Sequence, residues 1–224
     1  MTSEVPAECF VYITLPGETG AVTSGRFALT AGRRGIVEGR FVYGRSYVER
    51  VNAVALDPVE LKLTPRTYST VALGGVFGAL RDASPDYWGC LVIQCHLGNA
   101  QTGEMAYLLF SPDDRAGELG FGLNQTPPAP KRTFNQTLDL GALQVAADAF
   151  MADADDGAEG DHHEQIQKLL MLGTSMGGAR PKVVVEDDDA LWVAKFNRPD
   201  DPWNSARVEH AMLVLARRTH LPVA

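Results

Sequence analysis

The sequence contains no run of about 18 consecutive apolar residues, which predicts that no segment of the chain spans a membrane. Its first residues, MTSEVPAECF, lack a basic segment followed by an apolar one, so we expect no secretory signal peptide. Basic residues are also few: 20 Lys and Arg stand against 28 Asp and Glu, a formal net charge of -8. This balance argues against a broad basic surface for nucleic-acid backbones, and we expect no direct nucleic-acid partner.

Cysteine is scarce as well. The three cysteines, Cys9, Cys90 and Cys95, form no C-x-x-C pair, and their odd number argues against a disulfide framework. Because disulfide-poor chains are typical of reducing compartments, we expect a cytoplasmic protein. Free cysteines most often behave as small buried residues, and no other role is assigned to these three.

Residues 8–82 combine short alternating apolar segments with frequent turn residues, which predicts a compact β-rich module. Four aromatic residues in this region are expected to face its core. The expected strands cover 9–15, 25–31, 39–50, 53–56 and 59–63, and the aromatic residues are Phe27, Phe41, Tyr43 and Tyr47.

A helix is predicted directly after this module. Ser84, Pro85 and Asp86 supply a capping hydroxyl, a proline that the first turn tolerates and an acid near the positive helix end. We expect this helix to run to about Leu97 and to end before Gly98.

Beyond this helix the sequence is less regular. The stretch 123–136 contains three prolines and few core residues, and it is the best candidate for a linker. Helical spacing returns at 138–152 and at 161–172. The acidic segment 153–164 includes two histidines, so a metal site is one interpretation, but it lacks ligands spaced on a defined scaffold, and a solvated loop is the other.

Residues 173–196, GTSMGGARPKVVVEDDDALWVAKF, have the most informative order of elements. A glycine-rich loop precedes a strand, an acidic turn at 187–189 reverses the chain, and a second strand carries Lys195 near its end. A helix is predicted over 205–220. Its apolar positions recur at intervals of three and four, which predicts one buried face made of Val208, Ala211, Met212, Leu215 and Ala216.

This order has a chemical meaning. Small residues allow the N–H groups of a loop to approach phosphate oxygens, and a strand lysine can neutralise the α- and β-phosphates. Glu209, on the following helix, can hold Lys195 extended, as in the small lobe of a kinase. Two alternatives stay open at this point: the glycines can mark an ordinary hairpin entry, and a lone strand lysine is usually a surface residue.

The stretch 173–216 resembles the small-lobe segment of the HipA-family serine/threonine kinases. The upstream segments GVFGALRDASPDYWG (75–89) and DDRAGELGFG (113–122) resemble further signatures of that family, and residues 10–63 are similar to its β-rich N-terminal module. The similarity covers nearly the whole chain, in the order of the family.

The resemblance implies a role for individual residues. Lys195 corresponds to the lysine that contacts ATP, Glu209 to the acid of the following helix and Ser175 to the loop serine that the family autophosphorylates. Lys182 is a further base beside the loop, without a defined role. The loop itself is formed by Gly177, Gly178 and Ala179.

The resemblance also implies an α+β fold in three parts. They are a β-rich module (1–83), a helical connector (84–172) and a partial, antiparallel, kinase-like small lobe with one helix (173–224). The activity implied is that of a toxin of a type II toxin–antitoxin system, which uses ATP and Mg²⁺ to phosphorylate a protein of the translation machinery. The implied partner is a small helix-turn-helix antitoxin.

The residues that carry out phosphoryl transfer in a kinase are absent from the sequence. Phosphoryl transfer needs an orienting Asp, an Asn and a second Asp that binds metal, all supplied by the large lobe in this family. The sequence contains no H-x-D-x-x-x-x-N or D-F-D-like stretch. We therefore assign no catalytic or metal-binding residue and expect an N-terminal part of such a kinase, inactive alone. The alternative is a non-catalytic partner-binding module derived from one.

Overall fold

The structure is a computed structural model of the 224-residue chain. The residues that it describes are 6–31, 35–97, 102–111, 115, 117–129, 135–136, 140–141, 144–145, 147–149, 182–187, 190–198 and 200–223. Both helices and strands are present, and the α+β class predicted from the sequence is confirmed.

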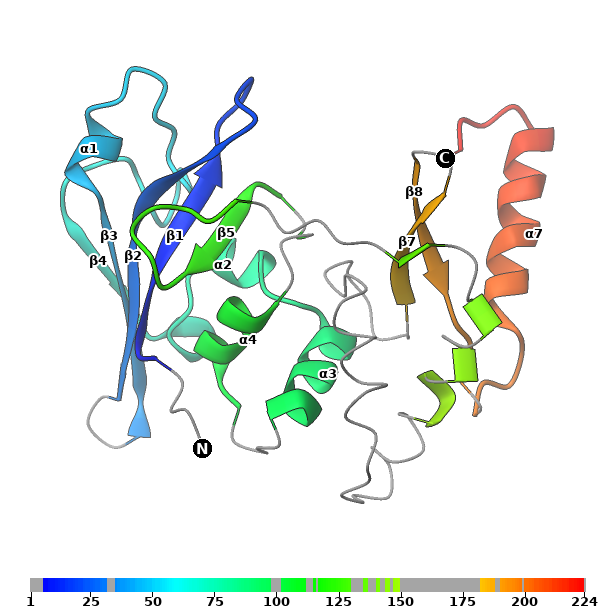
Figure 1. Ribbon diagram of the computed structural model, residues 1–224. Coiled ribbons are helices and arrows are strands. Elements are labelled where there is room, and N and C mark those ends of the chain that lie inside the picture. The colour runs from blue at the N-terminus through cyan, green and yellow to red at the C-terminus, as the bar shows by residue number, and fades with distance from the viewer. Residues whose placement is uncertain are drawn as a thin grey trace.

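The N-terminal half is built around a five-stranded sheet in the order β4-β3-β2-β1-β5, with every neighbouring pair antiparallel (Figure 1). In its first strand Cys9, Val11 and Ile13 belong to the core, as alternation predicted, and Tyr12 between them is buried as well. The strands are β1 (Glu8–Thr14), β2 (Ala21–Ala31), β3 (Val37–Tyr43), β4 (Thr67–Thr70) and β5 (Leu119–Gly122).

An aromatic cluster forms the centre of this module, and the prediction of its members is confirmed. Phe27, Phe41, Tyr43 and Tyr47 are each no more than 4% exposed. The Tyr43 ring lies edge-on to Phe41 at 4.8 Å and is stacked on Tyr47 at 5.8 Å between ring centroids. Such ring pairs stabilise a core beyond the area that they bury.

The strand prediction was wrong over the second half of 39–50. Strand β3 ends at Tyr43, and α1 (Arg45–Val48) follows directly, so that Tyr47 reaches the core from a helical turn. The Tyr47 hydroxyl donates to the Val54 carbonyl at 2.9 Å, which holds the next loop against this turn.

The next two predicted strands were wrong as well. Residues 53–56 form no strand, and 59–63 contribute only the bridge between Asp57 and Leu61. The Asp57 carboxylate accepts the Val59 and Glu60 N–H groups, an arrangement that closes a turn rather than a strand. The fourth strand is instead β4, whose single buried side chain is Tyr68.

Close backbone contact joins β3 to the segment after β4. A Cβ atom on Gly39 would lie 1.6 Å from the Gly75 carbonyl oxygen, and Gly75 itself has a φ of +87°. Only glycine satisfies both conditions without displacing the backbone. This contact seats η2 (Ala72–Gly74), the short helical turn that leads to the helices.

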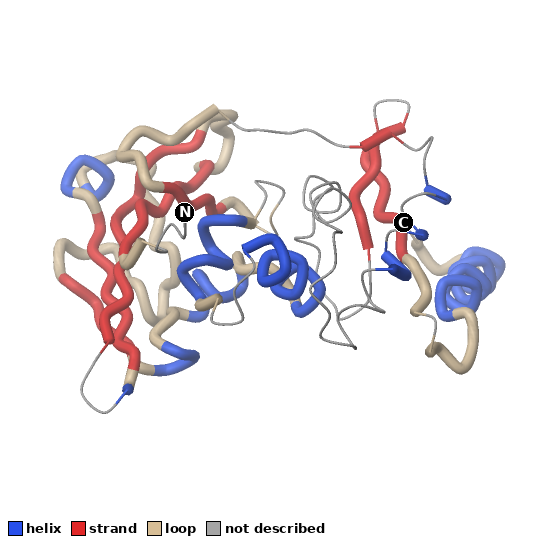
Figure 2. Tube along the Cα trace, turned by 60° about the horizontal axis from the view of Figure 1, so that its bottom comes forward, coloured by secondary structure: helices blue, strands red, loops and turns tan. Residues whose placement is uncertain are grey.

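Helices α2 (Gly78–Asp82) and α4 (Glu104–Phe110) lie beside the sheet, and α3 (Tyr87–Leu97) lies beyond them (Figures 1 and 2). The predicted helix near 84–97 is therefore confirmed, but its cap is different. The Gly89 N–H donates to the Asp86 carboxylate at 2.9 Å, so Asp86 rather than Ser84 caps the first turn of α3.

Arg115 has a structural role within the segment 113–122. Its guanidinium donates to the carbonyls of Ala83, Leu108 and Ser111 at 2.6–3.1 Å and lies 5.0 Å above the Phe121 ring. It thus ties α4 to strand β5. Because β5 pairs with β1, the N-terminal sheet includes a strand outside the range 1–83 predicted for the β-rich module.

The C-terminal part contains a second sheet, in the order β6-β7-β8, and one long helix. Strand β6 (Asn135–Gln136) is the end of the stretch predicted as a linker, and it pairs in parallel with β7. Strands β7 (Lys182–Asp187) and β8 (Ala190–Lys195) form the predicted antiparallel pair, and α7 (Ser205–Arg218) follows. Residues 140–141, 144–145 and 147–149 are helical, as predicted for 138–152.

The helix over 205–220 is confirmed, but the burial of its apolar face is not. Val208, Met212 and Leu215 are 50%, 59% and 52% exposed, and α7 contains no buried residue. Its sequence is amphipathic, yet the described residues leave the apolar side uncovered. Separately, no helix in the described part of the chain is long and apolar enough to cross a membrane.

Tyr43 gives a direct test of the N-terminal core. Its hydroxyl donates to the Leu61 carbonyl at 2.6 Å and accepts the Leu56 N–H at 2.8 Å. Tyr43→Phe leaves both groups without this partner and should lower the free energy of unfolding by about 1–3 kcal/mol. Denaturant unfolding measures this change, and Tyr87→Phe, at a site 63% exposed, is the matched control.

The same residue predicts an alkaline limit to stability. Burial raises the pKa of Tyr43 from 10.0 to about 12. The contribution of Tyr43 to the free energy of unfolding is therefore fully present below pH 10.0 and is lost as the pH rises toward 12. The stability difference between the native chain and Tyr43→Phe should therefore shrink over that interval. Equal effects of the Tyr43 and Tyr87 substitutions at neutral pH would contradict this description of the core.

Candidate functional site

Strands β7 and β8 form the scaffold of the candidate site. Their ladder runs without a register shift from Lys182 opposite Lys195 to Asp187 opposite Ala190. The β-branched residues of β7 suit such a ladder, and Val184 and Val185 are buried. Both ends of the ladder are therefore fixed by one register, with a lysine on each strand at the same end.

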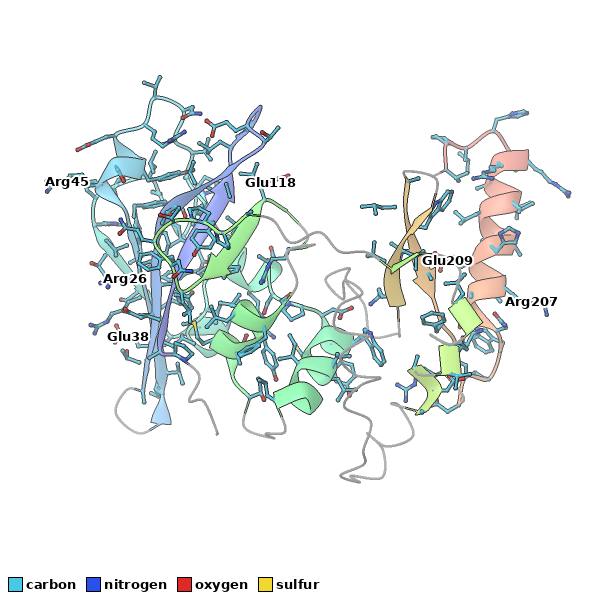
Figure 3. All side chains as sticks on the ribbon, in the orientation of Figure 1. Arg26, Glu38, Arg45, Glu118, Arg207 and Glu209 are labelled. Atoms are coloured by element: carbon cyan, nitrogen blue, oxygen red, sulfur yellow. The ribbon has the colours of Figure 1, made fainter. Side chains whose placement is uncertain are left out.

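Lys195 and Glu209 form an ion pair between β8 and α7. The contact predicted from their spacing in the sequence is therefore confirmed. Figure 3 shows Glu209 on the side of α7 that faces the strands and Arg207 on another side. Both side chains of the pair are 48% exposed, so solvent screens the interaction and its contribution to stability is small.

The connection between β8 and α7 is held by polar side chains. Asn204 caps α7, because its side-chain oxygen accepts the Arg207 N–H at 2.8 Å. The Asn197 side chain accepts the Ala206 N–H at 3.3 Å, which ties the end of β8 to the first turn of the helix. These bonds set the direction of α7 and place Glu209 within reach of Lys195.

Lys182 is in a different environment from Lys195. It forms an ion pair with Asp86, and the two side chains are only 6% and 9% exposed. A buried charge is costly unless a counter-charge and hydrogen bonds compensate for it. The structure thus places Lys182, predicted as a further base beside the loop, in a contact with the first turn of α3.

The two lysines are direct neighbours in the β7–β8 ladder. Side chains directly opposite one another in an antiparallel pair project from the same face, and like charges there are unfavourable. Each ammonium in this pair has its own carboxylate, Asp86 for Lys182 and Glu209 for Lys195. The arrangement therefore keeps two cations at one end of the sheet.

The glycine-rich loop cannot be located in the same way. Ser175, Gly177, Gly178 and Ala179 lie outside the described residues, as does the acidic segment 153–164. Within the described part of the chain, no group of three His, Cys, Asp or Glu residues could hold a metal ion.

Asp86 is the site residue that sequence reasoning missed. It was predicted only as a favourable acid at a helix start, and it does cap α3. The signal that it contacts Lys182 is absent from local sequence, since 96 positions separate the two residues.

No protein-family model and no curated protein matches the sequence. Membership of the HipA family remains a prediction from the motifs quoted above.

The two ladder lysines allow a matched stability test. Lys182→Met leaves the Asp86 carboxylate buried without its cation and should lower the free energy of unfolding by about 3–5 kcal/mol. Lys195→Met breaks an exposed pair and should change it by about 0–1 kcal/mol. Chemical denaturation of both variants, with the unmodified chain as reference, gives the two values. Similar losses in both variants would contradict the difference in burial.

Proposed function

We propose that this chain is the N-terminal part of a HipA-like serine/threonine kinase and that β7, β8 and α7 form its nucleotide-binding small lobe. The observation that carries the proposal is the ion pair between Lys195 on β8 and Glu209 on α7. A lysine on one strand of a hairpin, held by an acid on the next helix, is the arrangement by which kinases orient the ATP phosphates.

The environment of Lys195 suits this role. Its side chain is about half exposed, so the ammonium can exchange between Glu209 and an incoming anion without being uncovered first. The neighbouring Lys182 adds a second positive charge at the same end of the ladder. By resemblance, the loop at 173–180 brings backbone N–H groups to the same phosphates, and Ser175 is its phosphorylation site.

The proposal requires a second set of residues for the transfer step. The sequence contains no H-x-D-x-x-x-x-N or D-F-D-like stretch, so the orienting Asp, the Asn and the metal-binding Asp would belong to a large lobe. Mg²⁺ would be held there as well. The uncovered apolar side of α7, with Val208, Met212 and Leu215, is a surface that such a lobe could cover.

In the complete kinase, the proposed reaction transfers the γ-phosphate of ATP to a serine or threonine of a protein of the translation machinery. That substrate sets the reaction in the cytoplasm. By resemblance, the partner that neutralises the kinase is a small helix-turn-helix antitoxin. DNA is bound by this antitoxin and not by the kinase itself.

The second candidate function is a non-catalytic partner-binding module. The exposed apolar residues of α7, together with Trp192 and Trp203 at 59% and 64% exposure, favour protein binding of some kind. In that case Lys195 and Glu209 would be a surface ion pair without a ligand. The two proposals differ in whether the chain binds nucleotide.

Titration calorimetry of the purified chain with ATP separates them. We expect saturable binding that Lys195→Met weakens about tenfold or more, because a charge-assisted contact with phosphate is lost. Lys62→Met, the same substitution at an exposed site in the N-terminal module, should leave the affinity unchanged. Incubation with labelled ATP and Mg²⁺ should give no phosphoryl transfer by this chain alone.

Two results would contradict the kinase proposal. An absence of ATP binding would favour the partner-binding module. Equal ATP affinities of the unmodified chain and Lys195→Met would show that Lys195 does not contact the nucleotide. Phosphoryl transfer by this chain, abolished in Lys195→Met, would instead refute the requirement for a large lobe.

A further inference from the structure

The ion pair between Asp86 and Lys182 joins two parts of the fold that are distant in sequence. Asp86 precedes α3, which belongs to the N-terminal half, and Lys182 begins β7 in the second sheet. In Figures 1 and 2 the strands β7 and β8 lie between α3 and α7. The pair therefore connects the N-terminal half to the sheet that carries Lys195.

Asp86 is held firmly on its own side of this contact. One carboxylate oxygen accepts the Gly89 N–H at 2.9 Å, while the other contacts Lys182. The Asp86 carbonyl accepts the Cys90 N–H at 2.9 Å. The helix that follows is anchored by Trp88, Val92 and Ile93, each no more than 1% exposed. The carboxylate thus has a fixed position relative to the core around α3.

Lys182 links the fixed carboxylate of Asp86 to the candidate site. It is the first residue of β7 and the ladder partner of Lys195, and the register between the strands is unbroken. A β-ladder moves as a unit, because shifting one residue requires breaking the hydrogen bonds of its neighbours. Fixing the Lys182 ammonium against α3 therefore fixes the strand end at which Lys195 meets Glu209.

We infer that Asp86 is a positioning residue for the nucleotide site: by holding Lys182 in a buried ion pair, it sets the placement of the β7–β8 ladder, and thereby of Lys195, against α3. The identity of the ligand rests on the proposed function; the positioning of the ladder does not.

Hydrogen exchange tests the positioning without nucleotide. Asp86→Asn keeps an oxygen for the Gly89 N–H and removes the charge that Lys182 needs. We expect exchange about tenfold or more faster in the amides of 183–185 and 191–194, with exchange in β1 unchanged. Asp200→Asn makes the same chemical change in the exposed pair with Arg198, where Asp200 is 71% exposed, and should exchange like the unmodified chain.

A second variant separates positioning from stability. Asp86→Asn combined with Lys182→Gln removes both charges and leaves two amides that can hydrogen-bond to each other, so the double variant should unfold close to the temperature of the unmodified chain. If Asp86 positions the ladder, this double variant should still exchange faster in β7–β8, and Asp86→Asn, which keeps the Lys182 charge, should bind ATP about tenfold or more weakly. Because the double variant removes the buried cation together with its counter-charge, it should also fold if Asp86→Asn does not.

The outcomes are distinct. Unchanged exchange in β7–β8 in both Asp86 variants would overturn the inference. Recovery of normal exchange in the double variant would overturn it too, since the pair would then act through stability alone. If the unmodified chain binds no ATP, the proposed function fails, and the exchange measurements still decide whether Asp86 positions the ladder.

Discussion

A buried ammonium must meet a carboxylate, and in this protein that requirement links the two halves of the fold. Lys182 is almost completely enclosed, and Asp86, at the start of α3, is its counter-charge. Without such a partner, the cost of removing the charge from water would exclude Lys182 from its place in β7. The first residue of the second sheet is therefore constrained by a helix of the N-terminal half.

The same ladder carries a second lysine, Lys195, in an exposed position. Lys195 is about half exposed and shares its charge with Glu209 on α7. One end of a two-stranded ladder thus combines a buried, fixed cation with an exposed, exchangeable one. The first suits a structural contact and the second suits a ligand, and this division of roles underlies the proposal of a nucleotide site.

Sequence and structure agree where local periodicity or the order of the elements carries the information. The core positions of β1 and the burial of Phe27 and Phe41 could be predicted, because both follow from local periodicity. The contact of Lys195 with Glu209 could also be predicted, since only a strand end, a short connection and one helical turn separate them.

Features that local periodicity does not encode could not be predicted. Tyr47 was assigned to a strand, although its hydroxyl bond to Val54 and its stacking on Tyr43 favour a helical turn. The contact of Asp86 with Lys182 has no local signature. The periodicity of α7 indicated an apolar face correctly, but periodicity alone does not say whether the described chain covers that face.

Nucleotide-directed acylation tests the central claim, that Lys195 lies at a phosphate-binding site, most directly. An acyl-phosphate derivative of ATP transfers its acyl group to the nitrogen of a nearby lysine and releases ATP, and mass spectrometry locates the modified lysine among the five in this chain. We expect acylation of Lys195 that excess ATP suppresses. Acylation spread over exposed lysines such as Lys62, with no protection of Lys195 by ATP, would contradict it.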